Sequence, residues 1–216
     1  MQALGKNLFW CLIVLVILLQ GCAVGNRYNF SDVRADLQVV SANVKHVAIA
    51  TSDQRKVVLS GECAPTYVGM QRAGFGNPWR VNTESGLPLA DDLTKAVSES
   101  LSKKGYNSLP VYVKYSDDQS RILELLRERK AERALLFIIK KWESDTFMNI
   151  GVDYEIELTV YNAELVKLAS ASIAENKDLP GSFWDPPSAA RKEIPIAFKR
   201  ALETLLNDPK VIPVLQ

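Results

Sequence analysis

Residues 134–139 read Ala-Leu-Leu-Phe-Ile-Ile, an uninterrupted apolar run rich in branched side chains. Six residues are too few for a core helix, whose pattern normally extends over ten or more positions, but they suit a strand. Because no position in the run is polar, neither face of this strand is expected to meet water, which is typical of a central strand covered on both sides. The run therefore predicts the middle of a sheet, and the other elements are assigned outward from it.

The next apolar segment, residues 154–161, alternates with a period of two, with Glu155 and Glu157 among its polar positions. This pattern predicts a strand with one buried and one solvated face. Asn162-Ala163-Glu164 is a turn signal, and residues 166–174 return as the paired strand. Glu155 and Glu157 share a face and have the spacing of a paired-carboxylate site, but a solvated sheet face is the favoured interpretation.

Three segments have the spacing of amphipathic helices, namely residues 88–104, 116–133 and a closing helix that begins at a Ser188 cap. The first has acidic residues in its opening turns, lysines in its last turn and Gly105 at its end, as a helix dipole and a glycine cap favour. In the closing helix, Pro195 lies near enough to the start to be tolerated.

Residues 46–50 and 109–115 predict two further strands, so the element order is β-α-β-α-β-β-β-α. This order predicts an α/β (α+β) fold in which about three helices pack on a mixed sheet. Residues 52–87 contain many glycines and prolines and are expected to form a long loop. Within this loop, residues 57–59 and 66–68 are candidates for a short hairpin.

The N-terminus carries one charge, Lys6, followed by an apolar run over residues 8–19. This run is shorter than the ~20 residues that cross a bilayer as a helix, and it has the length of a signal-peptide core. It ends in Leu19-Gln20-Gly21-Cys22, which resembles the lipobox of bacterial lipoproteins. The resemblance implies a signal peptide over residues 1–21 and lipid, including palmitate, on Cys22. An uncleaved anchor helix is the alternative.

Ala23 follows the cysteine where an aspartate would imply retention at the inner membrane. By the same resemblance, the expected location is the outer membrane, with the domain facing the periplasm. Residues 22–44 are polar and weakly periodic, which predicts a tether, and residues 45–216 are expected to form the folded domain.

Charge and cysteine content limit the classes of partner and of covalent bond. Removal of residues 1–21 takes away Lys6 and no acid, which leaves basic and acidic side chains in balance and gives no electrostatic footprint for nucleic acid. Of the three cysteines, Cys11 lies in the signal core and Cys22 is the lipid site. Cys63 has no partner for an intrachain disulfide, and a buried, inert thiol is favoured over an exposed one.

The residues that carry catalysis or bind metals are sparse. His46 is the only histidine, and a structural role is favoured for it. No spacing of histidine, cysteine or carboxylate residues matches a metal site. We therefore expect no enzyme, no cofactor and no metal.

Two aromatic segments are candidates for binding a partner. Residues 69–80 form a glycine-rich stretch that contains Arg72, Phe75, Trp79 and Arg80, but the lysine and hydroxyl residue of a phosphate-binding loop do not follow. Aromatic and arginine side chains together are common at the energetic centres of interfaces, which makes this stretch a candidate. Phe183-Trp184 is the second. The plainer alternative is that these aromatic residues pack onto the sheet.

Residues 93–106, which end in Lys103-Lys104-Gly105-Tyr106, together with the strand, hairpin and closing helix described above, resemble YajG-like and CsgG-like periplasmic lipoproteins. The resemblance covers residues 46–207 as architecture and implies a non-enzymatic envelope role in an assembly. The expected function is therefore interaction with envelope proteins, self-association included. A module that binds a small lipid or glycan is the alternative, and an enzyme ranks third.

Overall fold

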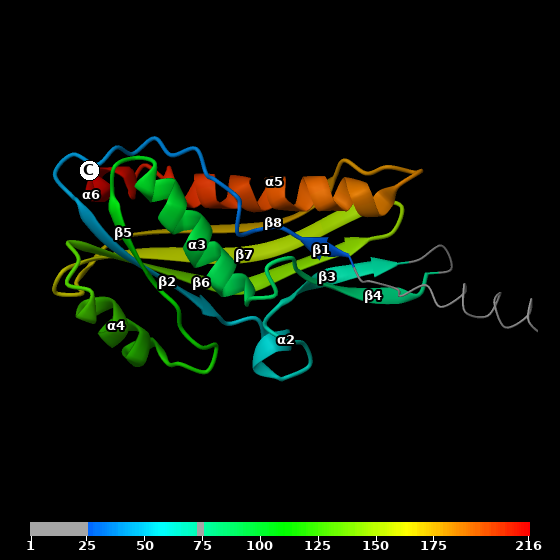
Figure 1. The fold of residues 1–216 in the computed structure, drawn as a ribbon, viewed down its shortest axis with the longest axis horizontal. Helices are drawn as coiled ribbons and strands as arrows, with labels where there is room; N and C mark the ends of the chain where they lie inside the picture. The colour runs from blue at the N-terminus through cyan, green and yellow to red at the C-terminus, as the bar shows by residue number, and fades with distance from the viewer. Residues whose placement is uncertain (1–25, 73–75) are drawn as a thin grey trace, which may run out of the picture.

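Strand β6 (Arg133–Thr146) lies in the middle of an eight-stranded mixed sheet, as the apolar run over 134–139 predicted. The computed structural model describes residues 26–72 and 76–216 (Figure 1), so Cys22 and Phe75 lie outside the described residues. On one side β6 pairs with antiparallel β7 (Ile150–Asn162) along its length. On the other side it pairs in parallel with β2 (His46–Asp53) and then with β3 (Tyr67–Arg72). The remaining strands are β8 (Lys167–Leu179) beside β7, β5 (Asn107–Val111) beside β2, β4 (Pro78–Thr83) beside β3, and β1 (Arg27–Tyr28) beside β4.

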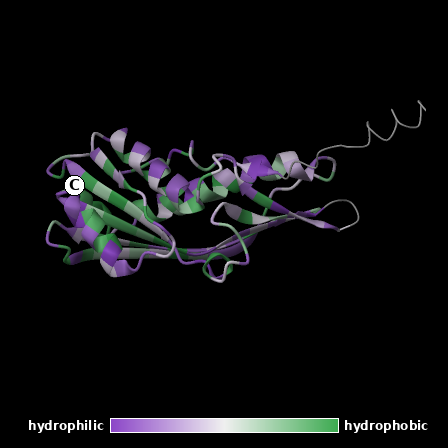
Figure 2. Ribbon diagram, turned by 60° about the horizontal axis from the view of Figure 1, so that its bottom comes forward, coloured by the Kyte–Doolittle hydropathy of each residue, from purple (hydrophilic) through white to green (hydrophobic). Residues whose placement is uncertain are grey.

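Helices cover both faces of the first half of β6, which confirms the α+β class and the predicted central strand. Leu135 and Phe137 belong to the larger core, under α3 (Leu89–Ser102) and α5 (Pro186–Leu206). Ala134 and Leu136 face the opposite way, into a smaller core under α4 (Gln119–Glu128). Figure 2 shows the apolar positions of the strands in green at the end of the sheet where the C-terminus lies. The short helices α2 (Lys56–Leu59) and α6 (Ile212–Leu215) complete the fold.

Several elements extend beyond their predicted bounds. Strand β6 continues to Thr146 past a bulge between Ile139 and Lys141, and β8 runs to Leu179. Beyond the bulge α4 no longer covers the outer face of β6, and polar side chains occupy it. The continuous apolar run therefore ends there, so the sequence pattern did not predict the second half of the strand. The prediction that Ser188 caps α5 is wrong. The cap residue is Asp185, whose side chain accepts a hydrogen bond from the backbone N–H of Ser188.

The prediction of a long loop over 52–87 is wrong, because the segment contains α2 and the β3–β4 hairpin. Residues 57–59 belong to α2 and do not form a strand. A buried ion pair orders the region: Arg55 donates to Asp53 from Nε at 2.8 Å and from Nη2 at 2.6 Å. The same guanidinium donates to the carbonyls of Pro65 and Tyr67, so it joins the end of β2 to the start of β3.

Gly69 fixes the approach of the hairpin to β6. Its φ is +148°, and a Cβ at this position would lie 2.2 Å from Oγ of Ser144. No other residue fits so close to the neighbouring strand, and the register shift between Tyr67 and Gly69 bends β3 at this point.

The predicted tether over 22–44 is wrong for residues 26–44, which pack against the domain. Tyr28, Phe30 and Val39 are fully buried. The ring of Phe30 lies 5.6 Å from Trp142 and 4.9 Å from Phe198, between the sheet and α5. Because this segment forms no helix or long strand, its apolar residues recur with no regular spacing. The sequence pattern therefore gave no indication that they are buried.

The pair Val39 and Val40 tests this packing, since neighbouring valines are 0% and 57% exposed. We expect Val39→Ala to lower the free energy of unfolding by about 2 kcal/mol, because two methyl groups leave the core. Val40→Ala should change it by less than about 0.5 kcal/mol. Urea denaturation of both variants measures the difference, and equal small effects would show that the segment is a tether.

Candidate functional site

A group of exposed apolar residues lies at one end of the long axis of the molecule. We call this the apolar end and define it by Trp79, Phe147, Met148, Phe183 and Trp184. They come from the β3–β4 hairpin, the turn between β6 and β7, and the loop between β8 and α5. These three connections lie together at the right-hand end of Figure 1. Phe183 is 75% exposed and Trp184 is 91% exposed, so the alternative of packing onto the sheet is wrong for this pair.

Contacts between the three connections hold the apolar end together. A surface depression of about 360 Å³ is lined by Arg72, Asp145, Phe147 and Met148 together with Asp178 near the end of β8. The β8–α5 loop crosses the β6–β7 turn so closely that a Cβ on Gly181 would lie 3.1 Å from the carbonyl oxygen of Met148. The exposed side chains therefore project from a backbone that is packed in place.

Phe183 and Trp184 are presented by a capped loop. Their rings contact edge to face, with centroids 5.4 Å apart. Immediately after them, Asp185 accepts from the backbone N–H of Ser188 at 3.1 Å, and its own N–H donates to Ser182 Oγ at 3.1 Å. Two large exposed rings on an ordered loop favour an interaction site, because soluble domains rarely leave such patches uncovered.

Of the arginines predicted for partner binding, Arg72 lines the depression at the apolar end but is engaged in an ion pair, and Arg80 points elsewhere. Arg72 donates to both carboxylate oxygens of Asp145, at 3.0 Å from Nε and 2.6 Å from Nη2. This bond raises the pKa of Arg72 and ties β3 to β6. Arg80 follows Trp79 on β4 and so points to the opposite face of the hairpin, toward Cys63 and Tyr67. Of the predicted aromatic residues, the structure brings Trp79, Phe183 and Trp184 to one end.

Phe147 and Met148 also belong to the apolar end, but sequence reasoning missed them. They form a tight turn in which the N–H of Phe147 donates to the carbonyl of Asn149 at 3.0 Å. Two large apolar residues inside a strand-to-strand turn were the available signal, because turns normally carry polar residues.

The described chain enters the fold at the apolar end. Asn26 is buried, and its Nδ2 donates to the carbonyl of Pro187 in the first turn of α5 at 3.1 Å. Pro187 lies three residues after Trp184, so the entry point and the exposed ring pair are neighbours.

A second depression, of about 480 Å³, lies at the carboxyl ends of the parallel strands β2 and β5, where ligands bind in many open α/β sheets. Asp53, Asp91, Tyr112 and Tyr115 are among its lining residues. Asp92, beside it in the first turn of α3, is 1% exposed, and its Oδ1 lacks a hydrogen-bond partner within the described part of the chain. Burial raises the pKa of Asp92 to about 6, although Ser85 donates to its other oxygen.

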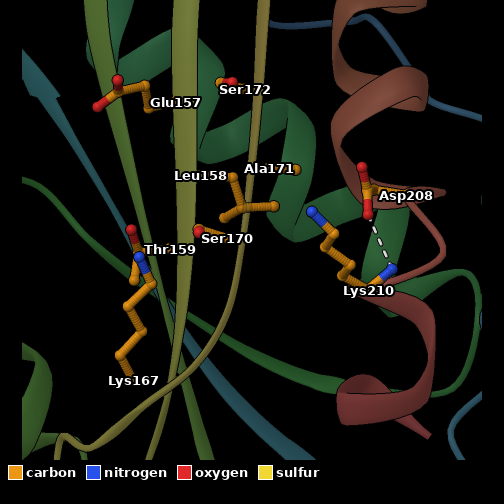
Figure 3. A pocket seen from close by; sticks show the side chains of 9 residues that line it. All are labelled: Glu157, Leu158, Thr159, Lys167, Ser170, Ala171, Ser172, Asp208 and Lys210. Atoms are coloured by element: carbon orange, nitrogen blue, oxygen red, sulfur yellow. Dashed lines mark hydrogen bonds between the residues drawn. The ribbon is translucent and has the colours of Figure 1, made fainter.

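A third depression, also of about 480 Å³, straddles the edge strand β8 (Figure 3). In the figure Lys210 donates from its backbone to Asp208, a bond of 2.8 Å, while Lys167 extends from β8 itself and Glu157 from the neighbouring β7. The polar side chains are thus spread along both sides of an edge and do not converge on one reacting atom.

The remaining polar candidates have structural explanations. Nδ1 of His46 lies 3.6 Å from Glu132 at the surface. Cys63 is buried, as expected, and burial raises the pKa of its thiol. Glu155 and Glu157 both pair with Lys140 on the exposed sheet face, as expected of a solvated face.

Searches for two other kinds of feature cover the described residues alone. Residues 26–72 and 76–216 hold no group of three His, Cys, Asp or Glu side chains that would suit a metal ion. None of the helices in these two ranges combines the length and the apolar character needed to cross a bilayer.

No protein-family model and no curated protein matches the sequence. Among solved structures, protein XCC0632 from Xanthomonas campestris, of the DUF330 family, is similar with a TM-score of 0.55 at 10% identity, over 88% of this chain and 95% of that chain. PelC from Paraburkholderia phytofirmans, solved as a dodecamer, has a TM-score of 0.44 at 8% identity, over 83% and 93%. Lipoprotein GNA1162 from Neisseria meningitidis has a TM-score of 0.30 at 10% identity, over 64% and 86%. At these identities only the first likeness is informative, and it shows a shared fold alone.

The raised pKa of Asp92, beside the second depression, can be tested through the pH dependence of stability. Because its pKa rises from 3.8 to about 6 on folding, the folded state binds the proton more tightly, and this carboxyl makes stability fall as pH rises from about 4 to about 6. The Asn variant does not titrate. The stability of Asp92→Asn relative to the wild type should therefore increase by about 2 kcal/mol between pH 4 and pH 7.5, measured by urea denaturation. A pH-independent difference would contradict the raised pKa.

Proposed function

We propose that the chain is a lipoprotein of the bacterial cell envelope, which carries lipid on Cys22 and acts through non-catalytic interaction or assembly. The proposal places it at the outer membrane with its domain in the periplasm, in accord with Ala23 after the lipobox cysteine. One observation carries the interaction role: Phe183 and Trp184 are exposed on an ordered loop beside the point where the described chain begins.

The N-terminal geometry supports lipid attachment close to the domain. Only three residues separate Cys22 from Asn26, whose side chain is bonded to the start of α5. Two or three acyl chains anchor a protein stably, because each buried CH₂ contributes about 0.8 kcal/mol. A lipid on Cys22 would thus hold the folded domain directly against the bilayer, without the long tether that the sequence suggested.

The alternative of a small-ligand module receives less support. A lipid or glycan site would need a concave, mostly apolar pocket with a few converging polar groups. The depression beside Asp91 lies at the surface, and the one across β8 is lined largely by charged and hydroxyl side chains. The exposed aromatic residues are the feature that an interaction role explains.

Lipid attachment is tested by growing expressing bacteria with a clickable palmitate analogue and comparing Cys22→Ser with Cys63→Ser. We expect the wild type and Cys63→Ser to carry label and to fractionate with the outer membrane, whereas Cys22→Ser should lose the label completely. The Cys63 variant controls for the loss of one thiol. Label that persists in Cys22→Ser, or an unlabelled wild type, would refute the lipoprotein assignment.

The interaction role is tested by chemical crosslinking in intact cells that express the lipoprotein. We expect crosslinked species heavier than the single chain, which mass spectrometry assigns either to copies of this chain or to other envelope proteins. Recovery of the single chain alone, under conditions that crosslink a known envelope complex in the same cells, would overturn the assembly role.

A further inference from the structure

We infer that the apolar end rests on the phospholipid bilayer that holds the lipid of Cys22, with Phe183 and Trp184 in the headgroup layer. This inference rests on the proposed function, since it uses the lipid on Cys22 as the point of attachment. It assigns to the bilayer a surface that the sequence suggested for a protein partner.

The reach of the chain sets where the bilayer must lie. The step from Cys22 to Asn26 spans four residue intervals, and an extended chain covers at most about 3.6 Å per residue, or about 14 Å in all. Asn26 is fixed to the carbonyl of Pro187 in the first turn of α5. The lipid-bearing residue must therefore lie within about 14 Å of Asn26, which is bonded to α5 just after the loop that carries Phe183 and Trp184.

The side chains at this end suit a membrane interface. Tryptophan gathers at the boundary between lipid and water, because its ring is apolar and its N–H can still donate a hydrogen bond. Phe183 and Met148 are apolar side chains, 75% and 59% exposed. All of them project from turns and loops at the tip of the sheet, so they can enter the headgroup layer while the strands stay in water.

The charges around the apolar end are mixed, which points to a bilayer contact driven by apolar area. Arg27, Arg191 and Lys192 are exposed near the entry point. Asp178 near the end of β8 and Asp185 in the following loop are exposed as well. The pair Arg72 and Asp145 is internally neutralised. Because the described residues form no basic cluster at this end, contact between the apolar end and the bilayer should be insensitive to salt and should not require anionic lipid.

The geometry favours the bilayer over a protein partner. An exposed aromatic patch on its own fits either, because tryptophan and phenylalanine are also enriched in protein interfaces. This patch, however, lies beside Asn26, which is within about 14 Å of the lipidated residue, so the bilayer is the first surface that it meets.

The test uses the native lipoprotein in liposomes whose phosphatidylcholine carries bromine on its acyl chains near the headgroup. Subtracting the fluorescence of Trp184→Phe from that of the wild type isolates the emission of Trp184, and this conservative change affects a side chain that is 91% exposed. We expect the bromolipid to lower this emission at least twofold, relative to liposomes of unbrominated lipid, at both low and high salt. Trp142→Phe is the control, because Trp142 lies in the core and is 1% exposed. Bromolipid should still quench the emission of Trp184 in this variant.

Three results would separate the inference from the function on which it rests. Protein that carries no lipid and does not float with liposomes contradicts both. Protein that floats, while Trp184 emits as in water and is unaffected by bromine, overturns the inference and leaves the lipoprotein function intact. Emission shifted to shorter wavelength without bromine quenching also overturns the inference, since a protein surface and not lipid then covers Trp184.

Discussion

Strand β6 is the constraint on which the rest of the structure depends. Its hydrogen bonds position β7, β2 and β3 directly, and the other strands are positioned through these three. The ring of Trp142, near its end, lies 5.2 Å from that of Tyr154 and 5.3 Å from that of Phe198, so the same strand also carries the aromatic centre of the larger core. Because sheet pairing and core packing both converge on β6, the position of α5 and of the loop before it follows from this strand.

The two ends of β6 differ, and this difference separates a structural end of the molecule from a candidate functional end. Near Arg133 both faces are covered, by α4 on one side and by α3 on the other. Past the bulge at Lys141 only the α5 face is covered. Here the β6–β7 turn exposes Phe147 and Met148, and the β8–α5 loop exposes Phe183 and Trp184. Ordered apolar side chains without a cover are costly in water, which gives this end a physical reason to meet another surface.

Electrostatics contributes more to shaping the domain than to recognition. Arg55 and Asp53 are both 2% exposed and hold the start of β3 in place, and Arg72 with Asp145 fastens the same hairpin farther along. The exposed charges near the apolar end are of both signs, so its proposed seating depends on aromatic area and on the lipid of Cys22. The proposal thus joins a stable lipid anchor and a weaker aromatic contact at one end of the molecule, where the anchor raises the effective concentration of the aromatic residues at the bilayer.

The sequence by itself determined the central strand, the half-buried strand at 154–161 and three helices, because apolar periodicity is a local property. It also identified Trp79, Phe183 and Trp184, although not that they lie together. Only the tertiary structure decided the burial of residues 26–44, whose side chains follow no regular period, and the order within 52–87, which depends on Arg55 reaching carbonyls ten or more residues away. Likewise, only folding could bring Asn26 to Pro187 and the turn at Met148 to Gly181 in the β8–α5 loop, because contacts between residues far apart in the chain leave no periodic trace in it.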